Sequence, residues 1–154
     1  MPYYAKKTTV GTDRTRLEIE RILIRYGATQ FASGWKGSQA VIGFRMNEKI
    51  IRFLLPLPEK NSSEFTETDS GRARRSEGLI AQAWEQGCRQ RWRALLLAIK
   101  AKLEAVECQI TTFEEEFLPY IVMPDGKTVA EHTLKTIESA YQTGRAVALL
   151  PGSF

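Results

Sequence analysis

The sequence has few of the residues from which common active sites and metal centres are built. Among 154 residues there is one histidine, and the two cysteines are Cys88 and Cys108. If both lie on one helix, their thiols are about 30 Å apart and cannot form a disulfide. One histidine and two separated cysteines also exclude the common zinc patterns. We therefore expect neither a metal site nor a cofactor.

Long apolar runs and sequence motifs of enzymes are missing as well. No stretch approaches the ~18–20 apolar residues of a membrane-spanning helix, and Met1–Lys7 does not resemble a secretory signal. Phosphate-binding glycine motifs and the nucleophile motif GxSxG are absent. Glu131-His132 is the one place where histidine adjoins a carboxylate, and a histidine near a helix start is usually a surface or capping residue. These absences favour a non-enzymatic protein that does not bind membranes.

The charge of the chain is distributed unevenly. The net charge is +4, but residues 1–56 carry +6, residues 57–71 carry −3, residues 72–102 carry +6 and residues 104–131 carry −6. Such asymmetry creates an electric field with a direction. The basic blocks fit a polyanionic partner. The acidic block fits either a basic partner or neutralisation of the basic helix beside it.

Residue periodicity predicts an α+β fold in a single domain that follows a short irregular arm. Apolar residues first recur at helical spacing and end at a glycine. The pattern then changes to two-residue alternation with tight turns, which predicts a three-stranded antiparallel meander with one covered face. The predicted elements are an arm at 1–11, a helix at 13–26 with Thr15-x-x-Glu18 as a capping box, and strands at Thr29–Trp35, Gln39–Met46 and Lys49–Leu55, all but the arm within a domain of residues 12–154.

A polar loop and one long amphipathic helix follow the meander. Residues 59–75 contain few apolar side chains, and loops of this length inside a domain are usually functional or mobile. In residues 76–108, apolar side chains recur at intervals of three and four, which keeps one stripe of a long helix apolar. Gly87 in this helix permits close packing of another element. The stripe comprises Ile80, Trp84, Cys88, Trp92, Leu95, Ile99, Leu103 and Val106, and we expect both tryptophans in the core.

Two shorter C-terminal helices are predicted from their capping signals. The first is marked by Thr111-x-x-Glu114 and Pro119, and the second by Thr128-x-x-Glu131 and Gly144. The tail at 146–154 is apolar and is expected to dock as an extended segment. The second helix is expected to face the core with Val129, Leu134, Ile137 and Tyr141.

Arginines gather where the polar loop meets the long helix. The planar guanidinium makes two parallel hydrogen bonds to a phosphate, so such a cluster favours nucleic-acid binding, to DNA or RNA. Basic residues of the meander extend the patch, and a tryptophan in its first strand either stacks on a base or joins the core. If the helix arginines pair with nearby glutamates, the cluster is only a solvated face. The candidate nucleic-acid-binding residues are Arg72, Arg74, Arg75, Arg89, Arg93, Lys36, Arg45, Arg52 and Trp35.

A second hypothesis is a protein-binding module that inhibits or recruits an enzyme. Such a module needs a shaped surface and no catalytic residues. An acidic face mimics nucleic acid toward a basic enzyme, and the edge of the meander is able to extend another sheet. The candidate residues for this role are Glu104, Glu107, Glu114, Glu115 and Glu116.

The segments Gly27–Pro58 and Arg89–Val129, with the closing Leu149–Gly152, resemble a group of small proteins encoded by tailed bacteriophages and prophages. The group has no assigned activity, so the resemblance supplies no catalytic residues. It implies a protein that acts in the bacterial cytoplasm during infection or lysogeny. The implied partners are viral nucleic acid, a phage replication protein or a host defence factor. A second copy of the chain is a further candidate, because a long apolar stripe suits self-association.

Overall fold

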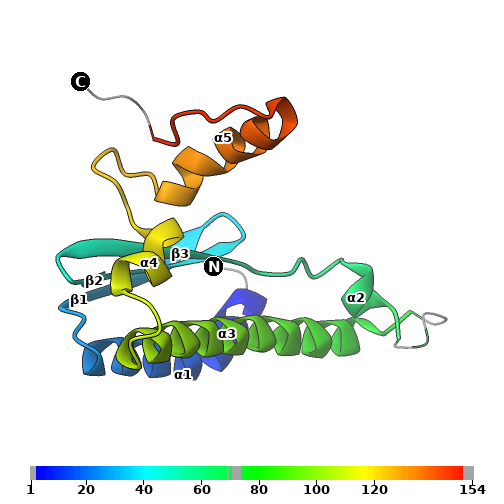
Figure 1. Cartoon of the computed structure of the whole chain (residues 1–154). Helices are drawn as coiled ribbons and strands as arrows, with labels where there is room; N and C mark the ends of the chain where they lie inside the picture. The colour runs from blue at the N-terminus through cyan, green and yellow to red at the C-terminus, as the bar shows by residue number, and fades with distance from the viewer. Residues whose placement is uncertain (1–2, 69, 71–73, 151–154) are drawn as a thin grey trace.

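The chain builds a three-stranded antiparallel sheet with two long helices on one face (Figure 1). The computed structural model describes residues 3–68, 70 and 74–150, with side chains from Thr12 onward in the first helix. The predicted α+β order is confirmed. The elements are α1 (Tyr3–Arg25), β1 (Gln30–Lys36), β2 (Gln39–Met46), β3 (Lys49–Pro56), α2 (Ser63–Thr66), α3 (Glu77–Glu107), α4 (Phe113–Phe117), the 3₁₀ helix η1 (Leu118–Tyr120) and α5 (Val129–Thr143).

The three strands lie within one residue of their predicted bounds. In β2, every second side chain from Ala40 to Met46 is buried, so one face of the sheet forms the core. Asn47 and Glu48 connect β2 to β3 with φ angles of 51° and 63°. A two-residue turn with two positive φ angles matches the twist of the strands it joins. Strand alternation and turn chemistry therefore fix the register locally.

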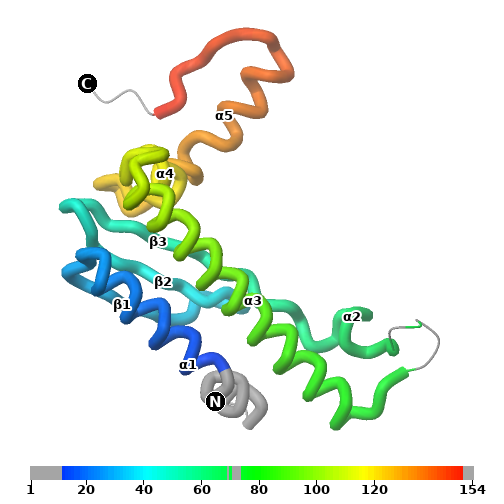
Figure 2. Tube along the Cα trace, turned by 60° about the horizontal axis from the view of Figure 1, so that its bottom comes forward, coloured from blue at the N-terminus to red at the C-terminus, as the bar shows by residue number. Residues whose placement is uncertain are grey.

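Helices α1 and α3 run side by side in the same direction beneath this face (Figure 2). Ile19 and Leu23 of α1 and Leu96 and Ile99 of α3 are completely buried against the sheet. Each contributes about 1.5–3 kcal/mol by leaving water. The central and C-terminal parts of the apolar stripe predicted for the long helix are thus the seam that joins α3 to the sheet and to α1.

The first helix begins ten residues before its predicted start. The expected irregular arm at 1–11 is helical from Tyr3, and Thr15 lies inside the helix, buried, rather than in a capping box. Extending an existing helix fixes one residue for each hydrogen bond gained, whereas only nucleation is costly. The turns of α1 from residue 12 onward, which pack against the rest of the fold, form this nucleus, and the preceding residues extend it.

The polar segment at 59–75 contains the short helix α2, where a structureless loop was predicted. Ser62 caps this helix, and Phe65 is buried against the half of α3 that projects beyond the sheet. Arg91 of α3 contacts the Glu64 carboxylate at 3.2 Å. One buried aromatic and one ion pair therefore hold α2 on α3.

Gly87 provides the space for α2. A Cβ atom at this position would lie 2.6 Å from Cε1 of Phe65, which confirms the expected close packing. We expect Gly87→Ala to release α2 locally, because the overlap costs about 1–3 kcal/mol and exceeds the helix-propensity gain of ~1 kcal/mol. Protease cleavage within 59–68 should accelerate. Gly78→Ala is the control, since nothing lies within 4 Å of its added methyl, and this variant should only stabilise α3. Equal cleavage in both variants would contradict the packing argument.

Helix α4 begins one residue later than predicted and, as predicted, ends before Pro119, at Phe117. The side chain of Thr112, not Thr111, caps α4 by accepting a hydrogen bond from the Glu115 amide. Pro119 lies in the first turn of η1, where a missing amide hydrogen is tolerated. The chain then pairs Ile121 with Ile51 through an isolated bridge along the free edge of β3.

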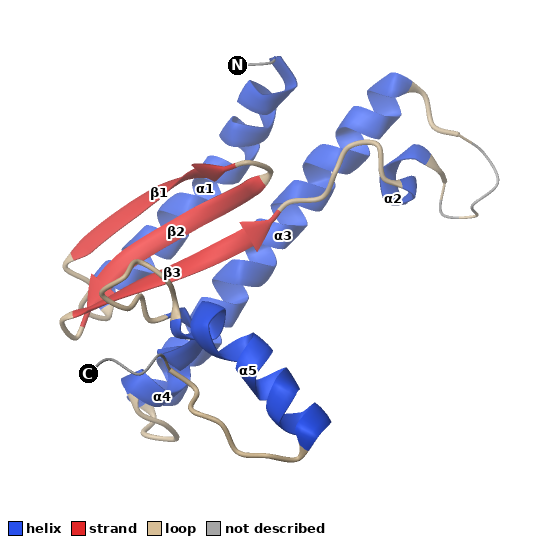
Figure 3. Cartoon of the chain, turned by 90° about the horizontal axis from the view of Figure 1, so that it is seen from above, coloured by secondary structure: helices blue, strands red, loops and turns tan. Residues whose placement is uncertain are grey.

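Helix α5 has its predicted caps but not its predicted packing. The capping box from Thr128 to Glu131 is present, and Gly144 ends the helix at φ 69°. Leu134 is 63% exposed and Tyr141 87% exposed, so the apolar face does not join the core. The described part of the tail, 146–150, is also exposed rather than docked. The reason is that α5 is fastened through polar contacts at its N-terminus, and it projects away from the β3 edge (Figure 3).

Candidate functional site

The predicted basic residues of the meander lie on the outer face of the sheet. The register pairs Arg45 with Ile50 and Arg52 with Gly43, and strand alternation places Lys36 on the same face. Helices α1 and α3 cover the opposite face, as Figure 3 shows. These three cations are therefore separated from the arginines of α3 by the thickness of the sheet.

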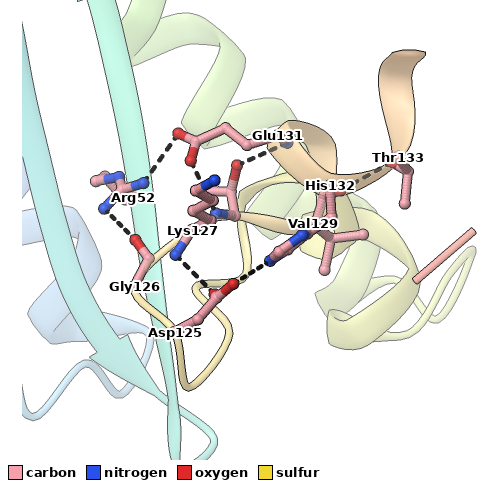
Figure 4. Close-up of polar contacts among 9 residues, drawn as sticks. Arg52, Asp125, Gly126, Lys127, Val129, Glu131, His132 and Thr133 are labelled. Carbon is pink, nitrogen blue, oxygen red and sulfur yellow. Dashed lines mark hydrogen bonds and ion pairs between the residues drawn. The ribbon is translucent and has the colours of Figure 1, made fainter. Parts of the chain in front are cut away.

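Arg52, on the outer face of the sheet, is held by the turn before α5 and by the first turn of α5. Its guanidinium donates to Oε1 of Glu131 at 2.9 Å and to the carbonyl oxygen of Gly126 at 2.9 Å (Figure 4). Partial burial opposes ionisation of Glu131, but hydrogen bonds from Arg52 and from the Thr128 amide outweigh it and lower the pKa of the carboxyl group. The side chain of Arg52 thus anchors α5 to β3.

His132, the histidine noted in the sequence, lies in the same connection between β3 and α5. Nε2 of His132 lies 2.7 Å from Oδ2 of Asp125 (Figure 4). The amide of Lys127 donates to Oδ1 of Asp125, and together with His132 it lowers the pKa of that carboxyl group. The Thr133 hydroxyl nearby donates to the Val129 carbonyl at 2.8 Å. These contacts fasten the turn and the first turn of α5.

The arginines of the loop lie at the far end of α3. Arg72 falls outside the described residues. Arg74 is exposed and its backbone bridges to Glu67, whereas Arg75 is half-buried. The backbone amide of Arg75 donates to the Thr66 carbonyl at 2.8 Å, and its guanidinium approaches the Phe65 carbonyl at 3.4 Å. This end of α3 is about 20 Å along the helix from Arg89.

Arg89 and Arg93 line a groove between α3 and α1. The groove has a volume of about 640 Å³, and Arg14 of α1 forms its other wall. Within the described ranges, Arg14 has no ion pair, and Arg89 donates only to Gln86, at 2.8 and 3.2 Å. Arg93 lies 3.5 Å from Glu18. The groove is lined by Arg14, Thr15, Gln86, Arg89, Gln90, Arg93, Ala94 and Leu97.

The same interhelical face continues toward the C-termini of α1 and α3. A second hollow of about 390 Å³ is lined by Arg25, Lys100 and Glu104, together with apolar neighbours. Helical spacing from Arg14 places Arg21 on the same edge of α1. We call this face the cationic groove. It comprises Arg14, Arg21, Arg25, Arg89, Arg93 and Lys100, with the carboxylates Glu18 and Glu104 between them.

The expectation that the candidate cations form one surface is therefore wrong. The described ones divide into an outer-sheet group, a group beside α2 and a group in the cationic groove. Alternation along the strands separates the first group from the last, because the face opposite the helices receives every second side chain. Arg14, Arg21 and Arg25 of the groove were not among the predicted site residues. Their spacing of seven and four residues on one helix edge is the signal that could have identified them.

The three tryptophans have three different environments. Trp92 is in the core as predicted, whereas Trp84 is only half-buried and its Nε1 donates to the Pro58 carbonyl at 2.8 Å. Trp35 is 47% exposed and lies beside a recess of about 240 Å³ between β1 and α1, with Arg16 and Ser33. This recess is on the side of α1 away from the cationic groove.

The acidic candidates are partly neutralised within the fold. Glu114 lies 3.1 Å from Lys49, and Glu116 lies 3.4 Å from Lys102. Hydrogen bonds from its own backbone amide and from Lys49 lower the pKa of Glu114. Glu115 accepts a hydrogen bond from Thr111 and Glu104 accepts one from Tyr26, while Glu107 is exposed. For Glu114 and Glu116, internal neutralisation is therefore the reading that the geometry favours.

The cysteines are not activated as nucleophiles. Burial raises the pKa of the Cys88 thiol to about 11. A hydrogen bond to the Glu104 carboxylate raises the pKa of Cys108. Both thiols are thus protonated at neutral pH. In the described part of the chain, no three potential metal-ligating side chains cluster, and no helix has the length and hydropathy of a membrane span.

Comparison with known protein families, curated proteins and solved structures finds no match for this chain.

Proposed function

We propose that this protein is a non-enzymatic nucleic-acid-binding protein that holds the phosphate backbone in the cationic groove. The observation that carries the proposal is the convergence of Arg14, Arg89 and Arg93 on one groove between two rigid helices. Neither Arg14 nor Arg89 is paired with a carboxylate among the residues that the structure describes. Gln86 holds two donors of Arg89, and the remaining donors of Arg89 and those of Arg14 are available to an external anion. In the phage context that the resemblance implies, this anion is viral DNA or RNA.

The dimensions of the cationic groove suit a backbone better than an isolated phosphate. Residues 14–25 of α1 and 89–100 of α3 each span about 16 Å. Over this length a duplex carries roughly nine phosphate charges, of which only those facing the protein are contacted. Exposed Leu97 lines the groove between the cations and leaves it partly apolar. Backbone contacts of this kind give affinity without sequence readout.

The salt dependence of binding tests this proposal. We expect a fluorescently labelled duplex of about 20 base pairs to bind with an affinity that falls steeply between about 50 and 200 mM KCl. With three to four phosphates neutralised, the log–log slope is about −3. The measurement is fluorescence anisotropy, repeated with a single strand of the same length.

The control for this experiment changes charge on the outer sheet face. A variant with Lys36→Gln and Arg45→Gln removes two cations that lie across the sheet from the groove. Its affinity should stay within about threefold of the native protein, because charges beyond a Debye length are screened. Absence of binding to both duplex and single strand at 50 mM salt would refute the proposal, and so would a slope near zero.

A further inference from the structure

Glu18 stands between the two rows of cations in the middle of the cationic groove. Its Oε2 lies 3.5 Å from Nη1 of Arg93, and its Oε1 lies 3.7 Å from Nζ of Lys100. Lys100 is seven residues, or about two helical turns, beyond Arg93, so both side chains reach the same point from one edge of α3. One carboxylate on α1 thus bridges two cations on α3.

We infer that Arg93 and Lys100 form a phosphate-binding subsite that Glu18 occupies when no nucleic acid is bound. This inference rests on the proposed function and deepens it. The carboxylate oxygens mark the place where phosphate oxygens bind, and the incoming phosphate displaces Glu18 toward solvent.

The geometry of the Glu18 contacts suits a displaceable group. Charge-assisted hydrogen bonds are usually 2.7–2.9 Å long, and both contacts of Glu18 exceed that range. The ion pair of Arg52 with Glu131, at 2.9 Å, is the contrasting fixed pair in this fold. The side chains of Arg93 and Lys100 are also about half exposed, so a ligand reaches them without opening the core.

Displacement of Glu18 also selects for an extended ligand. A single phosphate that enters the subsite gains two cations but removes the existing partner of both. A backbone that also contacts Arg14 and Arg89 gains cations that have no carboxylate partner in the described structure. The subsite therefore discriminates a polyanionic strand from a free mononucleotide.

The test compares two neutralising substitutions on α1. Glu18→Gln removes the internal competitor, and we expect a three- to tenfold tighter complex with the labelled duplex at 50 mM KCl. The log–log salt slope should stay close to that of the native protein, because a phosphate occupies the subsite in both complexes and the substitution removes only the internal competitor. Glu20→Gln is the matched control, because it makes the same change of charge on the edge of α1 that faces away from α3. Equal affinities of the two variants, or weaker binding by Glu18→Gln, would overturn the inference.

A double-mutant cycle assigns the gain to the subsite. In an Arg93→Gln background, Glu18→Gln should lose at least half of its effect on affinity. The reason is that the guanidinium of Arg93, which Glu18→Gln frees for the phosphate, is then absent. An undiminished gain would overturn the subsite and indicate a general charge effect. If Arg93→Gln weakens binding while Glu18→Gln leaves it unchanged, the subsite inference is wrong, but nucleic-acid binding in the cationic groove is supported. If the native protein does not bind at all, both fall.

Discussion

Replacing Arg14, Arg89 and Arg93 together with glutamate is expected to weaken binding of the labelled duplex by at least ~100-fold at 50 mM salt. Each substitution removes an attraction and adds a repulsion, and a pair of unit charges 4 Å apart interacts with about 1 kcal/mol even in bulk water. Three reversals therefore change the binding free energy by several kcal/mol, at 1.36 kcal/mol for each factor of ten. The measurement is anisotropy titration against the native protein.

The fold should survive these three reversals. Arg14 and Arg93 are exposed, and among the residues that the structure describes Arg89 bonds only to a neighbouring glutamine on its own helix. Circular dichroism and the thermal midpoint should remain close to native values. The control is an outer-face variant, Lys36→Glu with Arg45→Glu, which should retain binding within about tenfold. A triple variant that binds within threefold of the native protein would refute the groove as the binding surface.

The strands and the long helix were predictable because their signals are local. Alternation from Ala40 to Met46 requires one buried face, and a two-residue turn leaves a single register for the hairpin. The stripe along α3 similarly requires a partner along its central and C-terminal parts, and the structure supplies the sheet. Each pattern carries its own physical reason, so no knowledge of the rest of the chain was needed.

The packing of α5 was not predictable from the same kind of signal. Its amphipathic pattern is as clear as that of α3, yet Leu134 and Tyr141 face solvent. A pattern shows that one face is apolar, but it does not show what covers that face. The position of α5 is decided by the contact between Arg52 and Glu131, two residues 79 apart in sequence. Such a contact depends on tertiary structure alone.

The candidate site was partly predictable for a related reason. Arg89 and Arg93 were identified from the composition of one helix, whereas Arg14 joins them only because α1 packs beside α3 in the same direction. Arg45 and Arg52 were grouped with them because sequence alone does not show which face of the meander the helices cover. The sheet then divides cations that are all basic and mostly exposed into separate surfaces.

Phe117 is the more deeply buried of the two phenylalanines that join α4 to the core, and Phe117→Ala is expected to lower the free energy of unfolding by about 3–5 kcal/mol. The ring is completely buried, and its centroid lies 4.8 Å from that of Phe113, 6.1 Å from that of Phe44 and 6.3 Å from that of Phe53. Truncation to alanine removes these aromatic contacts and leaves a cavity between the sheet and α4. Urea denaturation measures the loss.

Tyr141→Ala is the matched control for Phe117→Ala. It removes an aromatic ring of similar size from a position that is 87% exposed, so the unfolding free energy should change by less than about 0.5 kcal/mol. A loss below about 1 kcal/mol for Phe117→Ala would show that α4 is not part of the core. A domain of this size has a total stability of about 5–15 kcal/mol, so the expected loss is a large share of it. The pair of variants thus separates the aromatic side chain that stabilises the fold from the one that the fold leaves in water.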